Sequence, residues 1–96
     1  MAAYFVFNYR INNREAYNPY LAAVPATIAE HDGEILAADF DSDGMEGDTG
    51  HVTVVLKFPS KQAARDWYGS DEYQAIIGLR KDNCEGVAAL AKAAGS

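Results

Sequence analysis

Six side chains of this chain have the chemistry to hold and orient a small organic molecule. They are four aromatic residues, one acid and one arginine: Tyr9, Trp67, Tyr68, Tyr73, Asp39 and Arg80. Phenol hydroxyls and an indole N–H at the end of an apolar cleft orient an aromatic or carboxylate ligand. The guanidinium of Arg80 can bind a carboxylate through two parallel hydrogen bonds. A tyrosine or Asp39 would be the acid or base if the protein transfers protons.

A purely structural interpretation of the same residues stays open. Trp67 and Tyr68 follow two alanines at the spacing of a packed core, where aromatic side chains usually serve packing. Arg80 would then cap helix carbonyls or pair with Asp71 or Glu72. The wider aromatic and basic set also contains Arg10, Tyr17 and Tyr20.

The string from Asp39 to Gly44 matches the opening of an EF-hand calcium loop. The twelfth position should supply a bidentate Glu, and Gly50 occupies it. Because the flanking residues alternate as strands do, a solvated turn rich in Asp and Gly is the better interpretation. Weak cation binding by the acidic loop at residues 41–48 stays open.

The remaining reactive residues predict neither a metal site nor a cofactor site. His31, His51 and Cys84 have no recognised zinc-ligand spacing. Ser-His-Asp, Gly-rich phosphate-loop and HExxH patterns do not occur. Cys84 has an acidic neighbour, Glu85, which does not favour a thiolate.

Length and charge narrow the class of protein. The 96 residues predict a single domain, residues 1–96. A net charge of −6, with no basic stripe, argues against a nucleic-acid partner. No apolar run reaches the about 20 residues that span a bilayer, so we expect no membrane partner. The single Cys84 fits a reducing cytoplasm, where we expect the protein to reside.

Hydrophobic periodicity predicts the elements that must position these residues. Alternation predicts strands at residues 3–11, 34–40 and 51–58, the first with Phe5, Phe7, Tyr9 and Ile11 on one face. A helix with an N-cap at Asn12-Asn13 carries an apolar stripe made of Tyr17, Leu21, Val24 and Ile28. We expect Pro25 to kink this helix. We expect Asp32-Gly33 to end it, with Gly33 at positive φ.

Residues 60–80 predict two further helices, separated at Gly69-Ser70. The second helix, from Ser70, is expected to bury Tyr73, Ile76 and Ile77. Residues 85–93 are ambiguous on their own, because their alanines favour a helix by propensity.

The run at residues 58–80, FPSKQAARDWYGSDEYQAIIGLR, resembles the signature of the bacterial family known as domain of unknown function 1330. That family is a branch of the dimeric α/β-barrel superfamily. The resemblance covers almost the whole chain and implies an α+β, ferredoxin-like β-α-β-β-α-β fold. An antiparallel sheet would be covered by helices on one face, with residues 85–93 supplying the fourth strand. The family offers no established catalytic residues to transfer.

The resemblance also implies a homodimer, formed by sheet-to-sheet packing, with a pocket between each curved sheet and its helices. Tyr4, Val6 and Val54 or its neighbours would contribute to the dimer contact. Related dimeric α/β-barrel proteins include cofactor-free monooxygenases and isomerases.

Three functions follow as hypotheses. The first is a small homodimeric protein that binds a small organic ligand in the pocket. The second is a cofactor-free enzyme, monooxygenase- or isomerase-like, acting on a small aromatic or carboxylate substrate. The third is a structural or regulatory oligomerisation domain whose sheet–helix space is filled by Trp67 and Tyr73. The sequence does not decide whether the protein is an enzyme.

Overall fold

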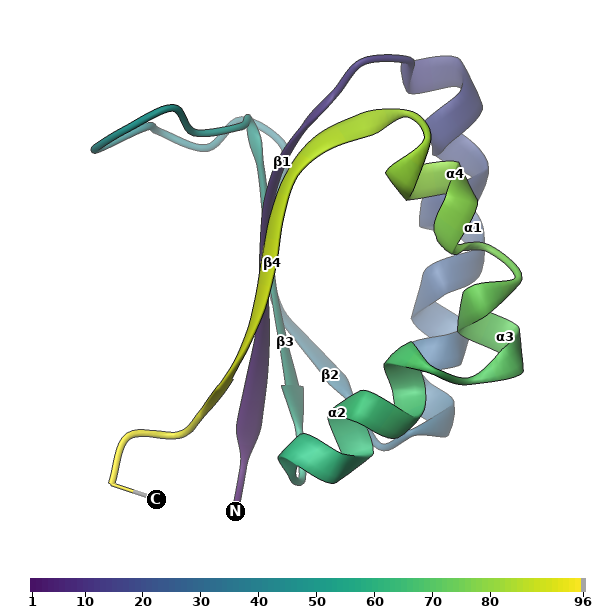
Figure 1. Ribbon diagram of the computed structural model, residues 1–96, viewed down its shortest axis with the longest axis vertical. Coiled ribbons are helices and arrows are strands. Elements are labelled where there is room, and N and C mark those ends of the chain that lie inside the picture. The colour runs from purple at the N-terminus through teal and green to yellow at the C-terminus, as the bar shows by residue number, and fades with distance from the viewer. Residues whose placement is uncertain (96) are drawn as a thin grey trace.

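Alternating side chains along β1 (Ala3–Ile11) divide the sheet into a covered face and an open face. Phe5, Phe7 and Tyr9 are buried on the covered face, whereas Val6 stays 40% exposed on the other. The computed structural model describes residues 1–95. Its four strands form one antiparallel sheet in the order β2-β3-β1-β4, and the helices all lie on one face of it (Figure 1). The α+β, ferredoxin-like prediction is therefore confirmed.

The chain runs through eight elements in the expected order. After β1 come α1 (Arg14–Glu30), β2 (Glu34–Asp39), β3 (Val52–Phe58), α2 (Lys61–Tyr68), α3 (Asp71–Gln74), α4 (Ile77–Lys81) and β4 (Cys84–Lys92). No helix among the described residues is long and apolar enough to cross a membrane.

Local capping starts each of the first three helices. The side chains of Asn13, Ser60 and Ser70 accept hydrogen bonds from the backbone N–H three residues further on, which satisfies a donor that the first turn leaves free. The helix that begins after Ser70 is interrupted after Gln74 and resumes as α4, so the prediction of one continuous second helix was wrong. Ala75 and Ile76 form this junction, and α4 begins with Ile77 and Gly78, which have low helix propensity.

The end of α1 differs from the sequence prediction in one detail. Asp32, not Gly33, adopts the left-handed conformation, with φ of 58°. Position 33 requires glycine for a different reason, because a side chain would not fit there. A Cβ there would lie 2.6 Å from Ile28 Cγ2 and 2.7 Å from Phe58 Cε1. The helix itself continues through Pro25 to Glu30.

β4 settles the ambiguity of the C-terminal alanines in favour of a strand. It pairs with β1 along its length, from Cys84 opposite Ile11 to Lys92 opposite Ala3. The backbone N–H and C=O groups along both edges of the central strand β1 need hydrogen-bond partners. This tertiary requirement outweighs the intrinsic helix propensity of alanine. Gly86 permits the close approach, because a Cβ there would lie 2.2 Å from Asn8 O.

One residue expected in the dimer contact lies on the opposite face of the sheet. Tyr4 and Val6 lie on that face as expected, but Val54 points toward the helices. Its neighbour Val55, paired with Val6, takes the open face instead. Successive side chains of a strand point to opposite faces, so a shift of one residue changes the face.

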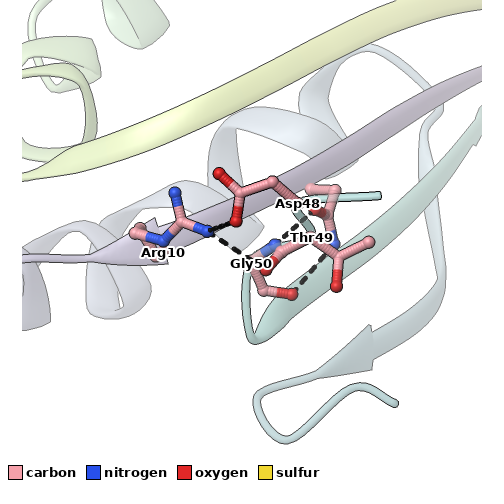
Figure 2. Close-up of polar contacts among 5 residues, drawn as sticks. Arg10, Asp48, Thr49 and Gly50 are labelled. Carbon is pink, nitrogen blue, oxygen red and sulfur yellow. Dashed lines mark hydrogen bonds and ion pairs between the residues drawn. The ribbon is translucent and has the colours of Figure 1, made fainter. Parts of the chain in front are cut away.

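The β2–β3 loop leaves the sheet on the side opposite the helices (Figure 1). Asn8 holds its base: Nδ2 donates to Gly50 O and Val52 O, both at 3.2 Å, and Oδ1 accepts from Gly50 N at 2.8 Å. Arg10 Nη2 donates to Asp48 Oδ1 at 2.7 Å and to Thr49 O at 3.2 Å (Figure 2). The loop is therefore fixed at its base by side chains of β1.

Candidate functional site

Trp67 and Tyr68 belong to the packed core between the sheet and α2. Trp67 is fully buried, and its ring centroid lies 5.4 Å from those of Phe5 and Phe58. The indole Nε1 donates to Thr27 Oγ1 at 3.0 Å. Tyr68 is stacked on Phe5 at 5.6 Å. Neither side chain lines either of the two cavities described below, so their contacts match the packing interpretation.

Four buried tyrosines, next to this core, form two hydroxyl pairs. Tyr9 Oη lies 2.6 Å from Tyr17 Oη, and Tyr20 Oη lies 2.7 Å from Tyr73 Oη. Within each pair one hydroxyl donates to the other, and the accepting hydroxyl retains its own O–H. Burial raises the pKa of Tyr9, Tyr17 and Tyr20 above the ordinary value, so these groups hold their protons at neutral pH. Each pair therefore has one O–H that is not used within the pair.

Arg80 reaches into the same region from α4. Its Cζ lies 5.1 Å from the ring centroid of Phe7 and 5.9 Å from that of Tyr9, and Nη2 lies 3.5 Å from Tyr73 Oη. Burial alone would lower the pKa of Arg80, but the phenol groups of Tyr73 and Tyr20 raise it above the ordinary value. The side chain therefore stays positively charged.

The sequence alternative in which Arg80 pairs with Asp71 or Glu72 was wrong. Across residues 1–95 the one ion pair is that of Arg10 with Asp48. Within the same residues, Arg80 Nε is buried and has no hydrogen-bond partner. Aromatic rings and phenol oxygens thus surround a guanidinium that no carboxylate neutralises.

An apolar cavity of about 120 Å³ lies between the sheet and α1. Its lining is formed by Phe7, Tyr9, Tyr17, Tyr20, Leu21, Val24, Pro25, Ile28, Ile35, Ala38, Phe40, Val54 and Leu56. Pro25 and Ile35 are exposed and mark its opening near β2, whereas the tyrosines are buried. Apart from the tyrosines, none of the lining side chains is polar.

A second, more polar recess of about 350 Å³ lies at the end of α4. Its lining is formed by Tyr9, Arg80, Lys81, Cys84, Glu85 and Gly86. Burial raises the pKa of the Cys84 thiol, which therefore remains protonated. Glu85 Oε1 accepts a hydrogen bond from Asn12 Nδ2 at 3.1 Å. Tyr9 lines both spaces and stands between them.

Of the six candidate residues, Tyr9 and Tyr73 thus lie beside the guanidinium of Arg80. Trp67 and Tyr68 contact Tyr73 from the packed core. Asp39 lies elsewhere: it ends β2, is exposed, and its Oδ1 accepts from Asp41 N at 2.8 Å. Tyr17 belonged to the apolar stripe expected from helical spacing, and that signal does locate the cavity wall. The lining residues of β2 and Phe40 gave no such signal, because β2 is a short edge strand with a register shift between Ile35 and Ala37.

Solved structures with the same architecture span nearly the whole chain. A protein of unknown function from Rhodopseudomonas palustris, RPA0582, matches with a TM-score of 0.79 at 12% identity, over 99% of this chain and 84% of that one. SnoaB from Streptomyces nogalater, described as a cofactor-independent oxygenase, matches with a TM-score of 0.71 at 10% identity, over 99% and 95%. At these identities the likeness shows the fold alone.

A third structure, described as an antibiotic biosynthesis monooxygenase, matches with a TM-score of 0.54 at 16% identity, over 97% of this chain and 98% of that one. No curated protein sequence matches the chain. One family model does, over residues 2–94. The chain therefore belongs to the family described as Domain of unknown function (DUF1330).

Proposed function

We propose that this protein binds a small, single-ring organic molecule in the cavity between the sheet and α1. The cavity carries the proposal, because its walls are apolar and three of its lining residues are tyrosines whose hydroxyls form buried pairs. An apolar cavity of about 150 Å³ in another protein is large enough to bind benzene. A volume of about 120 Å³ suits one ring.

The lining favours binding over proton abstraction. It contains neither a carboxylate nor a histidine, and Asp39 lies outside it. Tyr9 and Tyr20, with raised pKa values, are hydrogen-bond donors at neutral pH rather than bases. A polar group on the ring would therefore accept a hydrogen bond from a tyrosine and be held without being deprotonated.

A cofactor-free enzyme acting on an aromatic substrate is the second candidate function. Its support is the presence of buried phenol donors beside an apolar cavity, on a fold that SnoaB shares. Such donors can stabilise an oxyanion that develops on a bound ring. Oxygen uptake by the purified protein with phenol as substrate tests this candidate, and no uptake above the protein-free rate would contradict it.

Filling the cavity tests the binding proposal. Leu21→Trp places a larger side chain in the lining, whereas Ala22→Trp adds the same side chain at an exposed position one residue further along α1. Isothermal titration with benzyl alcohol should show binding to the natural protein and to the Ala22 variant. The Leu21 variant should bind at least about tenfold more weakly. Equal affinities in all three proteins would place the ligand elsewhere.

We also propose that two copies pair through the open face of the sheet. No helix covers that face (Figure 1), and it exposes 40% of Val6 and 74% of Val87. Val55 and Ala89 flank Val6 on the neighbouring strands. A second copy would remove this apolar patch from water, which gives the driving force for association.

We place the protein in the cytoplasm. Its one cysteine, Cys84, is free. A reducing compartment keeps such a thiol from oxidation. Fluorescence microscopy of a tagged chain in its native host would check the location.

A further inference from the structure

The charge of Arg80 sets the chemistry of what can bind beside Tyr9. Arg80 is half-buried, and a partly buried charge without an opposite charge beside it is unfavourable in a protein. Here the partners are phenol oxygens and aromatic faces, and the buried Nε–H has no acceptor within residues 1–95. A buried donor without an acceptor costs stability. Because the Arg80 side chain also lines the recess, an acceptor from outside the chain can approach its guanidinium there.

The recess gives such an acceptor a route to Arg80. Arg80 and Lys81 both line it, so two positive charges face one acid, Glu85. Asn12 already holds that acid by a hydrogen bond from Nδ2. Tyr9, whose ring centroid lies 5.9 Å from the guanidinium carbon of Arg80, supplies an aromatic wall of the same recess.

We propose that the molecule bound by this protein is an organic carboxylate, whose anionic group pairs with Arg80 in the recess while its ring lies against Tyr9 and extends toward the apolar cavity. This inference rests on the proposed function, since the same single-ring molecule is the ligand. A carboxylate offers two in-plane acceptors that match the guanidinium fork. The Tyr9–Tyr17 pair, which holds one O–H not used within the pair, stands at the junction of the two spaces.

Two small molecules of similar size test whether the protein prefers a negatively charged ligand. Benzoate has a carboxylate on its ring, and benzyl alcohol has a neutral hydroxymethyl group. Isothermal titration of the natural protein should show benzoate binding about tenfold or more tightly, as expected for hydrogen bonds to a charged acceptor. Arg80→Gln should remove this preference and leave the affinity for benzyl alcohol within about threefold, because the apolar cavity is unchanged.

Two further variants show whether the effect is specific to the guanidinium. Arg80→Lys keeps the charge but loses the fork, so its preference for benzoate should be intermediate. Arg65→Gln removes a positive charge from the exposed side of α2 and should leave both affinities unchanged. An equal loss in the Arg65 variant would show that net charge alone attracts benzoate and would overturn the inference.

The natural protein provides a readout that does not depend on any variant folding. The Nε–H resonance of Arg80 in a ¹⁵N spectrum should shift on saturation with benzoate and stay in place with benzyl alcohol. Binding of benzyl alcohol without a benzoate preference would overturn this inference and leave the proposed function standing. If neither probe binds at millimolar concentration, both fail.

Discussion

Hydroxyl pairing among the buried tyrosines explains how a nearly apolar interior accommodates four phenol groups and one cation. Tyr9 pairs with Tyr17 and Tyr20 pairs with Tyr73, at 2.6 and 2.7 Å. A buried hydroxyl without a partner would cost free energy. Pairing removes most of this cost and leaves one O–H per pair that is not used within the pair. The same residues therefore serve both stability and the proposed site.

Alkaline pH is expected to destabilise the protein through Tyr9 and Tyr20. Burial, the largest cause, raises the pKa of both phenols in the folded state. The unfolded chain releases these protons with an ordinary pKa of about 10. The folded state then binds more protons than the unfolded state above that pH, so the free energy of unfolding is unaffected below about pH 9 and falls as the pH rises beyond about 10.

Urea unfolding at about pH 8 and about pH 10.5 checks this dependence. A Tyr9→Phe, Tyr20→Phe double variant is the matched control, because it lacks both titrating groups. Its midpoint should fall less between the two pH values than that of the natural protein. The same fall in both proteins would show that other groups cause the loss.

Truncating Trp67 is expected to destabilise the fold severely. The side chain is fully buried, lies 4.1 Å from the ring of Tyr73 and donates to Thr27. Trp67→Ala leaves a cavity and should lower the free energy of unfolding by about 3–5 kcal/mol. Urea unfolding measures this loss. Tyr68→Ala removes a half-buried neighbour and should lower the free energy of unfolding by less. A larger loss for Tyr68→Ala than for Trp67→Ala would contradict the assignment of Trp67 to the centre of the core.

At the scale of elements, side chains of β1 control both faces of the sheet. Phe5, Phe7 and Tyr9 form the floor beneath the helices, while Asn8 and Arg10 hold the β2–β3 loop on the opposite side. β1 can do this because it is a central strand and its alternate residues point to opposite faces. One strand thus links the candidate site to the loop behind it.

Removing the Asn8 side chain should loosen the β2–β3 loop. Asn8 makes hydrogen bonds to Gly50, Val52 and Thr53, and Gly50 N–H would lose its side-chain acceptor. Asn8→Ala should therefore cost about 1–3 kcal/mol of unfolding free energy. Amide exchange at residues 41–50 should become faster, while exchange in α1 stays unchanged.

Asn18→Ala is the control for this experiment. Asn18 is exposed on α1 and accepts one hydrogen bond, from Arg14 at 2.9 Å. Its replacement should change stability by less than about 0.5 kcal/mol. If the Asn8 variant behaves in the same way, the loop is held by its backbone and by the Arg10–Asp48 pair.

At the scale of the whole molecule, the helices cover one face of the sheet and leave the other face open to a partner. The helices lie on one face only (Figure 1), and the other face carries exposed Val6 on β1, half-buried Val55 on β3 and exposed Val87 and Ala89 on β4. A 96-residue chain buries a limited share of its surface by itself. Pairing of two open faces would add a second buried layer without any further element.

A charge in the middle of the open face should prevent this pairing. Val6 lies between Val55 and Ala89, so Val6→Lys places an ammonium at the centre of the proposed contact. Native mass spectrometry should show twice the 10.4 kDa chain mass for the natural protein and the single mass for the variant. Ala22→Lys, on the exposed side of α1, should remain paired. A natural protein with the single chain mass would contradict the dimer proposal.

Local sequence signals located most of the elements. Alternation gave the strands at residues 3–11 and 51–58, and Asn13 and Ser60 gave helix starts that the structure confirms. These signals work because a capping side chain and the period of a strand act over a few neighbouring residues. The break in the helix after Gln74 was missed, because Ala75 and Ile76 carry no Pro or Gly signal that would mark where a helix stops.

The amino-acid sequence by itself determined the buried face of β1 and the set of residue types from which the site is built, and its family resemblance predicted the fold class and the fourth strand that the structure confirms. Only the tertiary structure decided that pairing with β1 outweighs the helix propensity of the C-terminal alanines, that Asp39 lies outside the cavity and that Arg80 has no acid paired with it within residues 1–95. The physical reason is the range of the interactions. Caps and alternation act between neighbours in the chain, whereas strand pairing, a cavity wall and a missing counter-ion depend on residues far apart in sequence.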